Sequence, residues 1–118
     1  MKANKINNIS WMITSKKVEQ VIRKIIEISN PSKLIIFGSY AKGKINLNSD
    51  LDVLVVVNNS IENPRKESVR IRRALKGILL SIDIIVIPES KFTELANTPG
   101  LIYREAIRTG KVVYESAA

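Results

Sequence analysis

The amino-acid sequence predicts an α/β (or α+β) domain in which helices cover a β-sheet. Short apolar runs rich in β-branched residues alternate along the chain with amphipathic or proline-initiated segments, an order that is typical of layered α/β domains. The chain has 118 residues, which is enough for one hydrophobic core but not for two. We therefore expect a single domain over residues 1–118.

The first element predicted is an amphipathic helix. Apolar side chains recur at the helical period from Val18 to Ile26. Thr14 or Ser15 can cap the start of this helix. Pro31 ends it, because the residue before a proline disfavours the α region.

Two strands and a tight turn are predicted next. The apolar run 33–37 (KLIIF) stops at Gly38 and predicts a strand, and residues 39–43 can form one helical turn. Residues 44–49 indicate a loop. The run 51–57 (LDVLVVV) is too apolar to alternate, so it predicts a strand that is buried on both faces.

The second half of the chain repeats this alternation. Asn63 as the cap and Pro64 in the first turn predict a helix that runs to about Lys76 and ends before Gly77. Four segments follow. The first is a strand over 80–87 (LSIDIIVI), and the next two are a short helix around 91–96 and another helix beginning at Pro99. The last is an edge strand over 112–114.

Composition excludes several kinds of chemistry. The chain contains neither Cys nor His, which rules out thiolate nucleophiles, Ser-His-Asp triads and imidazole bases. Any metal would bind oxygen ligands, which favours Mg²⁺ or Mn²⁺. The net charge of +8 attracts anions such as nucleotides, nucleic acid or an acidic protein, without choosing among them. We find no targeting signal and no membrane span, and we expect a cytoplasmic protein.

Three aspartates occur where apolar residues are expected. Asp50 and Asp52 flank Leu51 at the start of the most hydrophobic strand, so their side chains share one face. Asp83 lies inside a second apolar strand, and the three carboxylates would converge if these strands were neighbours. Either a base from elsewhere in the chain or a divalent cation could offset their repulsion. Because neither strand contains Lys or Arg, we favour a cation.

A possible phosphate-binding turn precedes these aspartates. Gly38 and Ser39 follow a strand, and glycine lets a ligand approach the backbone closely. Lys42 and Lys44 come next and could lie along a triphosphate or face water.

The combined pattern resembles the DNA polymerase β-like nucleotidyltransferase superfamily. The matching segments are 37–43 (FGSYAKG), 49–52 (SDLD) and 82–84 (IDI). The match is most similar to the minimal nucleotidyltransferase (MNT) family, whose usual ending resembles residues 101–115, and it covers about residues 15–115. The resemblance implies a small mixed β-sheet flanked by helices, and transfer of a nucleoside monophosphate, AMP from ATP, to a hydroxyl.

The resemblance also implies roles for individual residues. Asp50 and Asp52 would hold Mg²⁺ (or Mn²⁺), and Asp83 would complete a second metal site with Asp52 and deprotonate the acceptor. The residues implied to bind the nucleotide are Gly38, Ser39, Lys42 and Ser49.

The partners implied by the resemblance are an NTP and a HEPN-domain toxin, for which the protein would be the antitoxin. The chain is too short for a separate acceptor-binding domain, so the acceptor would come from a partner or lie between subunits of a homo-oligomer. We expect Asp83 at the floor of a cleft, away from the predicted helix that would form the partner surface. That helix contains Arg65, Lys66, Arg70, Arg72, Arg73 and Lys76.

Two other functions stay open. The chain could be a non-catalytic antitoxin that blocks its partner by occupancy, or a basic nucleic-acid-binding module. The three carboxylates argue against both, because a pure binder does not need them and they would repel nucleic acid in the absence of metal.

Overall fold

The computed structural model describes residues 12–44, 50–96 and 102–116. Within these residues one mixed four-stranded sheet has the order β3-β2-β1-β4. Strand β1 is antiparallel to β2 and to β4, and β2 is parallel to β3. The strands are β1 (Lys33–Phe37), β2 (Leu51–Val57), β3 (Ile82–Pro88) and β4 (Lys111–Glu115).

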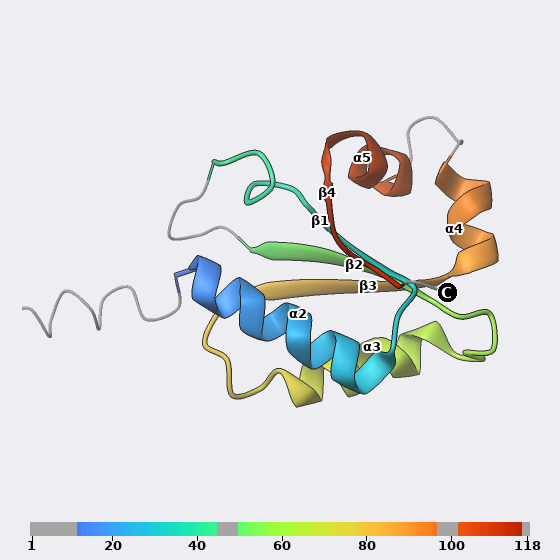
Figure 1. The fold of residues 1–118 in the computed structure, drawn as a ribbon, viewed down its shortest axis with the longest axis horizontal. Helices are drawn as coiled ribbons and strands as arrows, with labels where there is room; N and C mark the ends of the chain where they lie inside the picture. Colours follow the sequence, from blue (N-terminus) through green and yellow to red (C-terminus); the bar gives the residue numbers. More distant parts are fainter. Residues whose placement is uncertain (1–11, 45–49, 97–101, 117–118) are drawn as a thin grey trace, which may run out of the picture.

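Helices cover both faces of the sheet, as the sequence predicts. Helices α2 (Ser15–Ser29) and α3 (Pro64–Ala74) lie on one side, and α4 (Glu89–Ala96) and α5 (Ile102–Thr109) lie on the other (Figure 1). The expected α+β architecture with a mixed sheet is therefore confirmed. In the described part of the chain, no helix combines the length and the apolar character needed to span a membrane.

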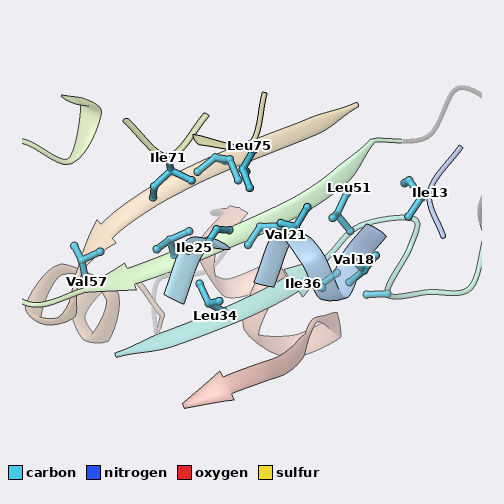
Figure 2. Close-up of a cluster of buried hydrophobic side chains, with 14 residues drawn as sticks. Ile13, Val18, Val21, Ile25, Leu34, Ile36, Leu51, Val57, Ile71 and Leu75 are labelled. Atoms are coloured by element: carbon cyan, nitrogen blue, oxygen red, sulfur yellow. The ribbon is translucent and has the colours of Figure 1, made fainter. Parts of the chain in front are cut away.

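Strand β2 is the centre of the core. Its apolar side chains are all buried, as the lack of alternation predicts. Leu51 and Val57 belong to the larger cluster, which packs under α2 and α3 (Figure 2). Leu54 and Val56 belong to the cluster on the α4 and α5 side. Every second residue of β2, starting from position 52, therefore faces α4 and α5.

The predicted helix caps are present. The side chain of Thr14 accepts a hydrogen bond from Lys17 N–H at 3.2 Å, and Asn63 accepts one from Lys66 N–H at 3.1 Å. Helix α2 ends at Asn30, whose left-handed backbone (φ 47°) lets its N–H bond to Ile26 C=O. These caps fix where each helix starts or stops relative to the sheet.

Some boundaries differ from the prediction. Strand β3 starts at Ile82 and not at Leu80, because Leu80 N–H donates to Ile78 C=O and the chain is still turning there. Residues 39–43 form a turn that is not classed as helix, with one helix-like bond from Lys42 N–H to Gly38 C=O. The predicted start of the last helix at Pro99 lies outside the described residues.

A buried polar network joins α2 to α3. Ser29 Oγ donates to Glu67 Oε2 at 2.6 Å, and both residues are buried. The Arg70 guanidinium donates to both Glu67 oxygens, at 3.1 and 3.0 Å, and to Ile28 C=O at 2.6 Å. The hydrogen bonds from Arg70, and then that from Ser29, hold the pKa of Glu67 below its usual range, although burial acts in the opposite direction. The network fixes α3 against α2.

Replacing Glu67 should make the free energy of unfolding less dependent on pH in the acidic range. Because the folded-state pKa of Glu67 is lowered, its contribution is complete above the unfolded-state value of about 4.3 and is lost as the pH falls through the folded-state value. We expect Glu67→Gln to lower the free energy of unfolding by about 1–3 kcal/mol at neutral pH, with a smaller difference below about pH 4. Urea denaturation across this pH range measures both.

The matched control is Glu62→Gln, which changes an exposed glutamate just before α3. It should alter stability little at any pH. An equal effect of the two substitutions would show that the Glu67 network does not hold the helices together.

Candidate active site

One end of the sheet gathers Gly38 and the three aspartates that the sequence singled out. Strand β1 ends there, whereas β2 and β3 begin there, because β1 is antiparallel to β2 and β2 is parallel to β3 (Figure 1). The register aligns Phe37 with Asp52, and Asp52 with Asp83. Gly38 follows directly after Phe37, so the turn that begins at Gly38 and the carboxylates of Asp52 and Asp83 lie at the same end of the sheet.

Asp52 and Asp83 are register partners on neighbouring strands. Parallel strands lie about 4.8 Å apart, and both residues belong to the alternating set that faces α4 and α5. The two Asp-containing strands are therefore neighbours, which is the condition that the sequence left open for the carboxylates to converge. Asp52 is half-buried, and this burial is the main cause that raises the pKa of its carboxyl. Repulsion by the charges of Asp83 and then of Asp50 raises that pKa further. This end of the sheet thus concentrates negative charge in a partly desolvated place.

Gly38 lies against the Asp52 side chain. Its φ of +76° is in the region that favours glycine, and a Cβ there would overlap Asp52 Oδ2 and lie 3.1 Å from Asp52 Cγ. The turn that follows is held by the bond from Lys42 N–H to Gly38 C=O at 3.2 Å and by one from Lys44 N–H to Ser39 C=O at 2.9 Å. The glycine turn and the half-buried carboxylate are therefore one structural unit.

Asp50 is exposed immediately before β2, and Ser81 orients it. Ser81 Oγ donates to Asp50 Oδ1, and Leu51 N–H donates to Ser81 C=O at 2.9 Å. Ser81 is not among the site residues that the sequence predicts. Its position two residues before Asp83, on the same side of the chain, was the available signal.

Asp83 is paired with a base from α3. Arg72 Nη2 lies 3.3 Å from Asp83 Oδ1, and the Asp83 side chain is 59% exposed. The expectation of a cleft floor away from the basic helix is therefore wrong. The reason is topological: β3 is the outermost strand of the described sheet on that side, and α3 packs beside it.

The donor set fits a hard divalent cation in its chemistry. Three carboxylates with no His or Cys favour Mg²⁺ or Mn²⁺. Among the described residues, no three such side chains are already arranged around one point. Asp50 turns to Ser81 and Asp83 to Arg72, so these two carboxylates would have to turn from their present partners before all three could share ions.

The structure does not connect two of the predicted nucleotide-binding residues, Lys42 and Ser49, to the carboxylates. Lys42 is exposed on the turn, and within the described residues no hydrogen bond or ion pair engages its ammonium group. Ser49 lies outside the described residues. Gly38 is the member of this set that the fold places against Asp52, and Ser39 follows it in the turn.

Residues 19–118 match the family model described as "Polymerase beta, Nucleotidyltransferase". The chain belongs to this family. This nucleotidyltransferase domain accounts for most of the chain, and membership confirms the resemblance that the motifs carry. No curated protein matches it.

Solved structures share the fold of this nucleotidyltransferase domain at low sequence identity. A toxin-antitoxin structure with AMP-PNP superposes with a TM-score of 0.54 at 19% identity, over 89% of this chain and 76% of that one. A Sulfolobus solfataricus protein described as a candidate nucleotidyltransferase gives 0.51 at 19%, over 87% and 90% of the two chains. A mutant of the toxin-antitoxin MntA-HpeT gives 0.53 at 17%, over 89% and 76%.

The contact between Gly38 and Asp52 can be isolated by comparing two glycines. Gly38→Ala and Gly43→Ala both place alanine at positive φ, which costs about 1–2 kcal/mol, but nothing lies within 4 Å of a Cβ at Gly43. We expect Gly38→Ala to lower the free energy of unfolding by about 1 kcal/mol more than Gly43→Ala, because it also displaces the Asp52 carboxylate. Equal losses in chemical denaturation would contradict this packing.

Proposed function

We propose that this chain is a minimal nucleotidyltransferase that transfers AMP from ATP to a hydroxyl on a partner protein, and that it is the antitoxin of that partner. The observation that carries the proposal is the row formed by Gly38, Asp52 and Asp83 at one end of the sheet. This row combines a glycine turn, whose backbone a phosphate can approach closely, with carboxylates whose negative charge is only partly offset by nearby bases.

Two of the structural neighbours support the details. One toxin-antitoxin structure contains AMP-PNP, which is an ATP analogue. The MntA-HpeT mutant replaces two aspartates, two positions apart, with glutamate. Asp50 and Asp52 have that same spacing. These two neighbours support ATP as the nucleotide and the pair Asp50 and Asp52 as part of the site.

Each residue at this end of the sheet has a task in such a transfer. Asp50 and Asp52 would hold Mg²⁺ or Mn²⁺, which supplies positive charge to the triphosphate and its leaving pyrophosphate. The backbone of Gly38 and the hydroxyl of Ser39 would hold the terminal phosphates, and the Lys42 ammonium would offset their charge. Asp83 would accept the proton of the attacking hydroxyl. Catalysis of this kind rests on positioning and charge, and it needs no histidine.

The proposed partner surface is narrower than the sequence indicates. Arg70 forms an ion pair with Glu67 and donates a hydrogen bond to Ile28 C=O, and Arg72 forms an ion pair with Asp83. Neither arginine is therefore available to a partner. Within the described residues, no ion pair engages the exposed side chains that remain on and just after α3. These are Arg65, Lys66, Arg73 and Lys76, and they suit an acidic surface on a toxin such as a HEPN-domain protein.

One observation favours a second function, an antitoxin that acts only by binding. Asp50 and Asp83 already have partners in Ser81 and Arg72 without any cation. A protein that had lost catalysis could keep its fold with the carboxylates satisfied in this way. Transfer of AMP to the partner distinguishes the two functions.

Asp52→Asn should separate stability from cation binding. Its carboxylate is half-buried beside Asp50 and Asp83, so removing its charge relieves repulsion. When both proteins are measured without metal, we expect the melting temperature of the variant to equal or exceed that of the wild type. In calorimetry, we expect the variant to lose Mg²⁺-dependent ATP binding. Unchanged ATP affinity in this variant would overturn the assignment of Asp52 as a metal ligand.

Asp83→Asn should separate nucleotide binding from transfer. The variant keeps Asp50 and Asp52, so it should retain most of the Mg²⁺–ATP affinity, but AMP transfer should fall by roughly 10²-fold or more without the base. Mass spectrometry of the proposed toxin partner, after incubation with this protein, ATP and Mg²⁺, detects the added AMP. If the wild type neutralises that protein without modifying it, the binding function replaces the catalytic one.

A further inference from the structure

Arg72 reaches Asp83 around β3, the outermost strand on that side of the described sheet. Helix α3 packs on the α2 side, where Ile84 is buried, whereas Asp83 belongs to the set of β3 residues that faces α4 and α5. The Arg72 guanidinium lies 3.5 Å from Ile84 C=O and 3.3 Å from Asp83 Oδ1. It therefore bridges from one face of the sheet toward the carboxylate cluster on the other.

The helix that carries Arg72 is held in place. Ile71 and Leu75 are buried in the main core, and the Glu67 network ties the preceding turn to α2. The next residue, Arg73, is exposed, and in the described part of the chain no ion pair engages it. The contact of Arg72 with Asp83 is thus specific to one position on a fixed helix.

We propose that Arg72 is a positioning residue that controls cation occupancy at Asp83. In the metal-free protein its guanidinium is the counter-ion of Asp83, and a divalent cation shared by Asp52 and Asp83 has to displace it. The inference rests on the proposed function, because it assumes that these carboxylates bind a cation.

The physical basis is competition between two positive charges for one carboxylate. A guanidinium and a divalent cation on the same Asp83 oxygens would repel each other across a few ångströms, a separation shorter than the screening length of about 8–10 Å at ordinary salt concentrations. Among the residues described, no hydrogen bond or ion pair joins Arg72 to Asp50 or Asp52, so a first cation can bind these two carboxylates without displacing the guanidinium. Cation binding would then occur in order, with the Asp83 site filled last.

The test is Mn²⁺ binding to the full chain, measured by titration calorimetry and by the spin-resonance signal of free Mn²⁺. The variants are Arg72→Gln, Arg72→Lys and Arg73→Gln. Arg72→Gln should bind the weaker Mn²⁺ ion about two- to fivefold more tightly than the wild type, the range expected for loss of an exposed ion pair. At about 1 M salt the difference should shrink, because the screening length falls to about 3 Å.

The other two variants are controls. Arg73→Gln removes the same charge from the same helix, so it should leave Mn²⁺ affinity near the wild-type value. Arg72→Lys keeps the charge and should also stay near it. Circular dichroism checks that all three fold, which the exposure of both arginines leads us to expect.

The outcomes separate this inference from the proposed function. If wild type binds Mn²⁺ and Arg72→Gln matches Arg73→Gln, Arg72 has no control over the site and the inference is overturned, while the metal site stands. If no variant binds Mn²⁺, the metal site and the inference fail together. Binding by Arg72→Gln alone supports the inference in its strongest form.

Discussion

The rest of this site depends on the pairing of two carboxylates across parallel strands. Burial of β2 on both faces fixes its register with β3, and that register sets Asp52 beside Asp83. A one-residue slip would turn Asp52 toward α2 and α3 and into the main apolar core, so the cost of burying its charge keeps the register and holds the carboxylates together despite their repulsion. Burial, and then repulsion by Asp83 and Asp50, raise the pKa of Asp52 in this arrangement.

The neighbouring residues can be understood as responses to this pairing. Gly38 has no side chain, which leaves room for the Asp52 carboxylate against the backbone of the turn. Ser81 donates to Asp50, and Arg72 supplies a positive charge to Asp83. Arg72 thus offsets the charge of Asp83 and a hydroxyl hydrogen bond stabilises Asp50, whereas half-buried Asp52 receives no base among the described residues. A cation would find its best position next to Asp52.

Helix α3 connects the core, the carboxylates and the protein surface. One of its faces is anchored through Glu67, Arg70 and the buried Ile71. Arg72 extends from it to the carboxylate cluster, and Arg73 and its basic neighbours face solvent. A helix that looks uniformly basic in the sequence therefore divides into structural, site-directed and surface residues. Charge counts cannot make this division, because it depends on what each side chain meets.

The sequence alone determined the layered α+β class, the helix caps, the buried central strand and the motif that joins Gly38 to the aspartates. These are local properties: period, capping chemistry and apolar runs act over a few residues. It also identified Asp83 as anomalous, because a carboxylate inside an apolar run is visible without a structure. Only the tertiary structure decided that Asp83 is an exposed edge residue paired with Arg72, that Ser81 orients Asp50 and that Arg70 belongs to a buried network. Strand order and helix packing set these contacts between residues that are distant in the chain, and no local pattern records which arginine of a basic helix will face a carboxylate.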